Sequence, residues 1–219
     1  MWLPRCIKNK SSASLALLAC VLVAAGCASS GSKPANERGQ AAAVTPGGDF
    51  ALDISPEAQT MYEQAVAVMA SGDYLDAELR FKEFLLQYPG YPGAHVNLAI
   101  IHSTNENHDA ALDAIEAALA INPGYAQALN QKGMLLRRNG KFLEAEAAYL
   151  KAVTARPDYA LAHYNLGVLN ELYLQRLDVA LQHFERYQEI VGEDPQVEKW
   201  ITDLTRRVAA NQRTANEAD

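Results

Sequence analysis

Cysteine is almost absent from this chain of 219 residues. Its three cysteines, Cys6, Cys20 and Cys27, all lie near the amino terminus. The rest of the chain can therefore form neither a disulfide nor a thiolate metal site, and must be stabilised by packing. Basic charge is also scarce, because 19 lysines and arginines face 26 acidic residues and the net charge is −7. Such a chain lacks the electrostatic footprint of a protein that binds nucleic acid or an anionic membrane surface.

Motifs for catalysis and for cofactor binding are also missing. The sequence after residue 26 contains no glycine-rich phosphate loop, no paired-histidine metal motif and no nucleophile elbow. His95 and His102 lie seven residues apart, but without a third ligand we expect both to be ordinary half-buried histidines. The carboxylates are scattered, as where Glu78 and Lys82 are neighbours on a helix surface. We therefore expect no enzyme activity, no metal, no cofactor and no small-molecule substrate.

The amino terminus has the pattern of an export signal. Arg5, Lys8 and Lys10 precede an apolar run over residues 15–25, which is too short for a membrane-spanning helix of about 20 residues. The run ends at Ala24-Ala25-Gly26-Cys27. This sequence resembles the lipobox of bacterial lipoproteins, and the resemblance implies that Cys27 is lipidated after cleavage of a signal peptide over residues 1–26. Leu17-Leu18-Ala19-Cys20 also fits the pattern, so Cys20 is an alternative processing site.

Lipid attached to this cysteine, with palmitate as one of its acyl chains, would hold the protein in the cell envelope without a membrane-spanning helix. Ala28 follows the cysteine where lipoproteins retained at the inner membrane typically carry aspartate, so the resemblance favours the periplasmic face of the outer membrane over the inner membrane. Removal of residues 1–26 leaves 16 basic and 26 acidic residues, a net charge of −10. Residues 27–54 are rich in Ser, Gly, Ala and Pro, and we expect a flexible tether with a reach of about 30 Å.

A repeat of 34 residues organises the chain after Ser55-Pro56-Glu57, which has the residues of a helix start. Three sets of small or helix-ending residues keep this period: Pro89, Pro123 and Pro157; Ala77, Ala111 and Ala145; and Ala65, Ala99, Gly133 and Gly167. Bulky residues recur at the twenty-fourth position of each unit, as Phe81, Ile115, Tyr149 and Phe184. Small residues let helices approach closely, the bulky ones fill the space beside them, and proline ends the second helix of each pair.

These features, with His163-Tyr164-Asn165-Leu166-Gly167 and Gly140-Lys141-Phe142-Leu143-Glu144-Ala145, resemble the tetratricopeptide repeat family. The resemblance implies an all-α solenoid of antiparallel helix pairs, each made of helix A and helix B. We place four units at 58–91, 92–125, 126–159 and 160–194 within a domain over 55–194. Gly72 and Gly140 should form left-handed turns between the two helices, and Asn107 should do so in the second unit.

The fourth unit departs from the pattern, because its turn over residues 173–177 has no glycine and the unit contains one extra residue. Either its helix A is longer or its turn is altered. Asp194-Pro195 then begins a capping helix predicted over 195–209, with a disordered tail over 210–219. The capping helix carries an apolar stripe of Val197, Trp200, Ile201, Leu204 and Val208.

In the tetratricopeptide family, partners bind in a concave groove. The groove is lined by helix A side chains at the second, fifth, sixth, ninth, twelfth and thirteenth positions of each repeat unit. The resemblance implies that the groove residues here are Tyr62, Val66, Val96, Asn97, Ile100, Asn130, Met134, Arg137, Tyr164, Asn165, Val168 and Glu171, with Gln131 and Arg138 as further polar candidates. The residues at the ninth position of the four units, called the ninth row here, are all apolar: Val66, Ile100, Met134 and Val168. We therefore expect these side chains to form a water-facing stripe that binds an amphipathic helix or an extended hydrophobic segment. Alternatively, a neighbouring helix or the tether covers this row.

These observations lead to the hypothesis of a non-enzymatic adaptor: a lipid-anchored scaffold that binds one or more envelope proteins. It resembles repeat lipoproteins of TonB-type energy transduction, of pilus and secretin assembly and of outer-membrane assembly. Two alternatives remain. The chain could be an accessory subunit or regulator of a peptidoglycan-acting enzyme, or a cytoplasmic co-chaperone if the amino terminus is not an export signal.

Overall fold

The computed structural model describes residues 55–216. The predicted signal peptide, Cys27, the tether and the last three residues of the tail lie outside the described residues. Within them, no helix combines the length and apolar character needed to cross a membrane.

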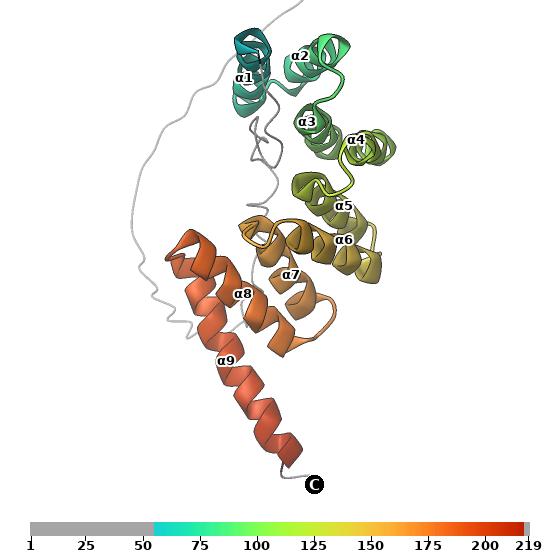
Figure 1. The fold of residues 1–219 in the computed structure, drawn as a ribbon. Coiled ribbons are helices and arrows are strands. Elements are labelled where there is room, and N and C mark those ends of the chain that lie inside the picture. The colour runs from blue at the N-terminus through green and yellow to red at the C-terminus, as the bar shows by residue number, and fades with distance from the viewer. Residues whose placement is uncertain (1–54, 217–219) are drawn as a thin grey trace, which may run out of the picture. The chain divides into compact units, whose positions relative to one another are not determined.

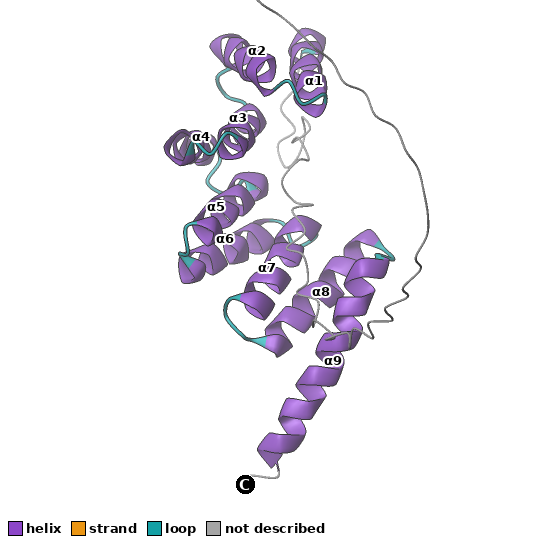
Figure 2. Ribbon diagram, turned by 180° about the vertical axis from the view of Figure 1, so that it is seen from behind, coloured by secondary structure: helices purple, strands orange, loops and turns teal. Residues whose placement is uncertain are grey.

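Residues 55–216 form nine α-helices joined by short loops and contain no strand (Figures 1 and 2). The helices are α1 (Pro56–Ala70), α2 (Tyr74–Gln87), α3 (Pro92–Thr104), α4 (His108–Ile121), α5 (Ala126–Arg138), α6 (Phe142–Ala155), α7 (Ala160–Leu172), α8 (Leu177–Val191) and α9 (Pro195–Asn216).

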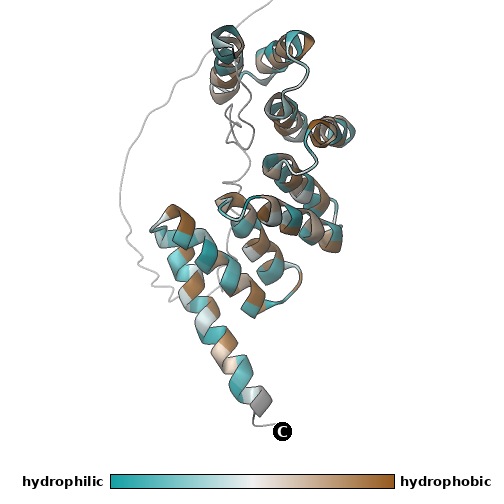
Figure 3. Cartoon of the chain, viewed as in Figure 1, coloured by the Kyte–Doolittle hydropathy of each residue, from teal (hydrophilic) through white to brown (hydrophobic). Residues whose placement is uncertain are grey.

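The first eight helices form four pairs that follow one another along the chain (Figure 1). Each helix A (α1, α3, α5, α7) packs most extensively against the helix B that follows it (α2, α4, α6, α8). The A helices of later units also contact each other, α3 with α5 and α5 with α7. Hydrophobic and hydrophilic residues alternate around the helices (Figure 3), as expected where each helix buries one side against its neighbours. The predicted all-α solenoid of helix pairs is confirmed.

The turns between paired helices show where the repeat needs a left-handed backbone. Gly72 and Gly140 have φ of +88° and +73°, but in the second unit this conformation is adopted by Glu106, with φ of +58°. The expectation that Asn107 would supply the turn is wrong. Asn107 instead caps α4, because its side-chain oxygen accepts a hydrogen bond from the backbone N–H of Ala110 at 3.3 Å.

The structure shows how the fourth unit accommodates its extra residue, which was expected either to lengthen helix A or to alter the turn. Helix α7 has 13 residues, the same as α3 and α5, so helix A is not longer. The turn is altered: Gln175 has φ of +57°, and the backbone N–H of Arg176 donates to the carbonyl of Asn170 at 2.9 Å. The extra residue is therefore absorbed in the loop between α7 and α8.

Small residues on helix A face large ones on helix B. A Cβ atom added at Gly167 would lie 2.7 Å from the ring of Phe184, and one added at Gly133 would overlap the ring of Tyr149. Both rings are fully buried. The glycines are therefore required by the close approach of the two helices, as the period of small residues predicts.

Helix α9 closes the array by packing against α8. Trp200 is 6% exposed, and its ring centroid lies 5.4 Å from that of Phe184 and 5.9 Å from that of Tyr164. The capping role predicted for this helix is confirmed. Helix α9 continues to Asn216, beyond the predicted end at 209, because no glycine or proline stops it and Arg213 Nε bonds the carbonyl of Ala209 at 3.2 Å.

Candidate protein-binding groove

The side chain at the fifth position of each repeat unit, on helix A, lies in the interior. Tyr62, Val96 and Asn130 are at most 1% exposed, and Tyr164 is 7% exposed. Burial, followed by the nearby Tyr125, raises the pKa of Tyr62 far above its ordinary value. These side chains therefore form the floor of the predicted groove and hold the helices together.

Buried amides link successive A helices across this floor. Asn97 Nδ2 donates to Tyr62 Oη at 2.8 Å, joining α3 to α1, and Asn165 Nδ2 donates to Asn130 Oδ1 at 2.9 Å, joining α7 to α5. Asn130 in turn directs its Nδ2 toward the sulfur of Met134 at 3.6 Å. In both pairs the sixth residue of one unit meets the fifth residue of the unit before it. The asparagines predicted as groove contacts thus also connect the repeats.

The ninth row is less open than expected. Ile100 and Met134 are 3% and 5% exposed, whereas Val66 and Val168 are only half-buried. Met134 packs with Tyr149 and residues of α7, so the close approach of α5 and α7 explains its burial. The expectation of a stripe that faces water along its whole length is therefore wrong for its middle members. Val66 and Val168, in the first and fourth units, retain accessible apolar surface.

The charged side chains predicted to line the groove already bond to other residues within the described chain. Glu171 is 5% exposed and pairs with Arg207 of α9 at 3.0 Å. Arg137 donates to Tyr173 Oη at 3.3 Å and lies over the ring of Tyr173, 5.7 Å from its centroid. Arg138 Nη1 donates to the carbonyl of Ser103 at 3.4 Å, and Gln131 is half-buried. Glu171 is thus part of the attachment of the cap.

Gln127 is a further residue at a family groove position, and nothing about its residue type marks it out in the sequence. It occupies the second position of the third unit, on α5, and is 7% exposed. Its side-chain oxygen Oε1 is buried, and nothing in the part of the chain that the structure describes donates a hydrogen bond to it. A buried acceptor without a donor costs about 1–3 kcal/mol. The family position was the available indication, but only the structure shows the unmet acceptor.

The histidines do not form a metal centre of the usual kind. His163 and His183 approach each other, with 3.1 Å between their Nδ1 atoms, and His163 Nε2 lies 3.1 Å from the carbonyl oxygen of Pro157. Within residues 55–216, no cluster of three or more His, Cys, Asp or Glu is placed to hold a metal ion. Since Pro157 can only accept, His163 Nε2 carries the proton and His183 donates to His163 Nδ1.

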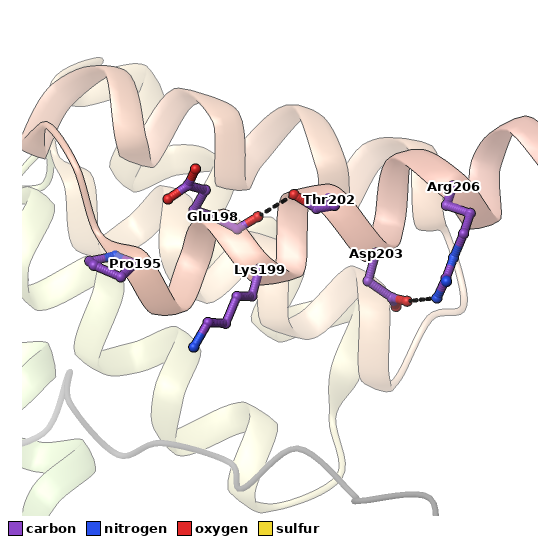
Figure 4. A pocket seen from close by; sticks show the side chains of 6 residues that line it. All are labelled: Pro195, Glu198, Lys199, Thr202, Asp203 and Arg206. Carbon is purple, nitrogen blue, oxygen red and sulfur yellow. Dashed lines mark hydrogen bonds and ion pairs between the residues drawn. The ribbon is translucent and has the colours of Figure 1, made fainter.

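A hollow of about 500 Å³ along α9 is lined by Pro195, Glu198, Lys199, Thr202, Asp203 and Arg206 (Figure 4). Its polar side chains bond within the helix: Arg206 pairs with Asp203 at 2.7 Å, and Thr202 donates to the carbonyl of Glu198 at 3.0 Å. This arrangement is typical of a solvated helix face. It adds nothing to the groove.

The chain matches the model of the tetratricopeptide repeat over residues 57–126 and 130–196. It belongs to the tetratricopeptide repeat family. Repeats of this family form scaffolds for protein–protein interaction, which is the class of function that the fold and the groove define.

Similarity to curated proteins is confined to part of each relative. The chain is 29% identical over 147 residues to human protein O-mannosyl-transferase TMTC1, covering 65% of this chain and 16% of that protein. It is 37% identical over 73 residues to the peroxisomal targeting signal receptor of Candida albicans, covering 33% of this chain and 12% of the receptor. The chain therefore spans less than a fifth of these relatives.

Solved structures share the fold. PilF of Pseudomonas aeruginosa is 22% identical with a TM-score of 0.64, over 73% of this chain and 72% of PilF. The repeat protein TTC0263 of Thermus thermophilus is 21% identical with a TM-score of 0.59, over 70% of this chain and 84% of that one. The first repeat domain of Spaghetti (RPAP3), solved with an HSP90 peptide bound, is 19% identical with a TM-score of 0.50, over 54% of this chain and 95% of that one.

Proposed function

We propose that this protein is a non-enzymatic adaptor of the bacterial cell envelope that binds a segment of a partner protein along its A helices. The observation that carries the proposal is Gln127, whose buried Oε1 lacks a donor among the described residues. A backbone N–H of an extended segment, or a side-chain donor of a bound helix, would satisfy this oxygen. Gln127 thus holds a buried acceptor at a position that the family uses for binding.

The accessible apolar surface lies in the first and fourth units of the array. Val66 on α1 and Val168 on α7 are half-buried, and burying the remainder of each against a partner is favourable at about 25 cal/mol per Å². Gln127 belongs to the third unit, so the three features require a segment that contacts several units. A segment with apolar residues near both ends and a donor between them has the matching chemistry.

Lipid attachment at Cys27 is the second part of the proposal. It rests on Ala24-Ala25-Gly26-Cys27 and on the basic and apolar residues before it. A role at the periplasmic face of the outer membrane follows from the residue after the cysteine, and a machine for pilus or secretin assembly, for outer-membrane assembly or for TonB-type energy transduction is the proposed setting. Inhibition of lipoprotein signal peptidase should accumulate a heavier precursor, and Cys27→Ala should abolish palmitate incorporation. Palmitate incorporation that survives Cys27→Ala but is lost in Cys20→Ala would move the anchor to Cys20.

Groove binding is tested by charge substitution at the two accessible valines. We expect Val66→Glu together with Val168→Glu to abolish the crosslinks that the membrane-bound protein forms with its partner, read by mass spectrometry. Leu79→Glu is the matched control, because Leu79 is 60% exposed on α2, a B helix. Helical circular dichroism should be unchanged in both variants. Crosslinks that persist in the valine variant would reject the groove as the binding surface.

A further inference from the structure

A second hollow, away from the groove, lies between α4, α5 and α6 and has a volume of about 490 Å³. The apolar part of its lining includes Leu119 of α4, Leu129 and Leu136 of α5, and Ala148 of α6. Leu129 and Leu136 lie on a different side of α5 from the groove residues Asn130 and Met134, since each residue turns the helix by about 100°. The hollow and the groove are therefore distinct surfaces of α5.

Lysines gather around this hollow. The described residues hold five lysines, at 82, 132, 141, 151 and 199, and Lys132, Lys141 and Lys151 all line it. The described residues as a whole carry 14 basic and 21 acidic side chains, a net charge of −7. The hollow is therefore a local cationic site on an acidic protein, with Glu144 as the one acid that lines it.

Two of the three lysines form no ion pair within the described chain. Lys132 pairs with Glu116 of α4 at 2.6 Å. Lys141 and Lys151 are exposed, and neither forms an ion pair with any residue between 55 and 216. A pair of exposed, unpaired ammonium groups beside an apolar wall attracts a ligand that combines carboxylates with aliphatic surface.

The lysines are not part of the repeat pattern. One repeat earlier, Lys141 and Lys151 correspond to Asn107 and Ala117, and two repeats earlier to Asp73 and Glu83. Asn107 and Asp73 cap their helices, whereas Lys141 at the start of α6 makes no side-chain capping bond. The third unit thus lacks the side-chain helix cap found in the first two units and has a lysine in its place. The packing of the repeat does not require this positive charge.

We infer that the hollow between α4, α5 and α6 is a second docking site, for an acidic polypeptide segment that carries an aliphatic side chain between carboxylates. The aliphatic side chain lies against Leu119 and Leu136, which are half-buried, and the flanking carboxylates pair with Lys141 and Lys151. A volume of about 490 Å³ is in the range of ligand sites and admits a leucine with its neighbouring backbone.

The experiment uses the purified full-length chain and a fluorescein-labelled probe peptide of sequence SEDLLDES, measured by fluorescence polarisation. We expect binding that weakens at least tenfold in a Lys141→Gln, Lys151→Gln double variant and falls as salt rises from about 50 to 200 mM. Lys82→Gln with Lys199→Gln is the control, since it removes the same charge elsewhere and should leave the affinity within twofold. Peptides in which the acids are amides, or the leucines are serines, should bind at least tenfold more weakly.

Three results would overturn the inference: no binding of the probe, equal loss in the two lysine double variants, or equal binding of the amide peptide. Vesicles of phosphatidylglycerol serve as a further probe, and their binding with loss only in Lys141→Gln, Lys151→Gln, while the peptide fails to bind, would assign the site to lipid headgroups instead. Val66→Glu with Val168→Glu should leave probe binding unchanged. This outcome separates the second site from the proposed groove, so either can fail alone.

Discussion

Asn97 of α3 donates a hydrogen bond to the phenol oxygen of Tyr62 of α1 at 2.8 Å, and both side chains are at most 1% exposed. The two residues are 35 positions apart, which is one repeat plus one residue. The same relationship joins Asn165 to Asn130 two repeats later. Polar side chains beneath the groove therefore fix the register between neighbouring units.

Removal of this amide should weaken the junction between the first two units. We expect Asn97→Ala to lower the free energy of unfolding by about 1–3 kcal/mol, since a buried hydrogen bond is lost along with side-chain packing. Chemical denaturation followed by circular dichroism measures the change. Asn105→Ala, at an exposed position after α3, should change stability by less than about 0.5 kcal/mol. Equal effects of the two substitutions would show that the amide contributes nothing to the junction.

The close contact between α7 and α8 predicts a steric effect of a single methyl group. Gly167→Ala should destabilise the protein by about 1–3 kcal/mol, because its Cβ would lie 2.7 Å from the buried ring of Phe184. Gly90→Ala is the control, since a Cβ there meets no atom within 4 Å. Thermal unfolding should show a lower Tm for the first variant only. A Tm of Gly167→Ala equal to that of Gly90→Ala contradicts the packing described for the fourth unit.

Glu106 in a left-handed turn predicts a stabilising substitution. Glu106→Gly should raise the free energy of unfolding by up to about 1 kcal/mol, because glycine adopts φ of +58° without the steric cost of a Cβ. The reverse change in the equivalent turn, Gly140→Ala, should lower it by a similar amount. Urea denaturation of the two variants provides the comparison. Destabilisation by Glu106→Gly would mean that the Glu106 side chain contributes more than its backbone strain costs.

The His163 and His183 pair predicts loss of stability in acid. Burial, and then the neighbouring His163, lowers the pKa of His183 from 6.5 to about 4. Burial is also the main cause that lowers the pKa of His163, with Arg186 acting in the same direction and the hydrogen bond to Pro157 opposing it. Below pH 6.5 the unfolded chain therefore binds more protons than the folded one, and stability falls as the pH drops toward 4.

His183→Gln should flatten this dependence between pH 7 and pH 5, whereas His108→Gln, at an exposed position, should leave it unchanged. Unfolding midpoints measured in denaturant at each pH test the prediction. If the wild-type protein and His183→Gln lose stability in parallel over this range, the histidine pair is not the cause.

The fold was predictable from sequence because its repeating contacts require particular residues. Small residues had to face rings such as Phe184 and Tyr149, so the 34-residue period revealed the helix pairs, and α3, α5 and α7 begin 34 residues apart. The left-handed residue in the second unit was missed because glutamate does not indicate positive φ, although the 34-residue period between Gly72 and Gly140 marks position 106 as equivalent. The extent of α9 was also missed, since no residue marks its end.

The candidate site was less predictable than the fold. Family positions identify which side chains lie along the A helices, but burial depends on how closely those helices approach each other. Met134 is covered because α5 and α7 are in contact, whereas Val168 on the same row retains exposed surface. The unmet acceptor of Gln127 depends on the positions of all surrounding donors, which the residue types alone do not determine.

Site-specific photocrosslinking in intact cells is the most direct measurement of the central claim. A benzoylphenylalanine placed at Val168, on helix A of the fourth unit, should form an adduct with a partner polypeptide, and Gln127→Leu should reduce its yield by removing the unmet acceptor. The same probe at Leu150, which is 43% exposed on helix B of the third unit, should not form this adduct. Adduct formation from Leu150 but not from Val168 would contradict the account.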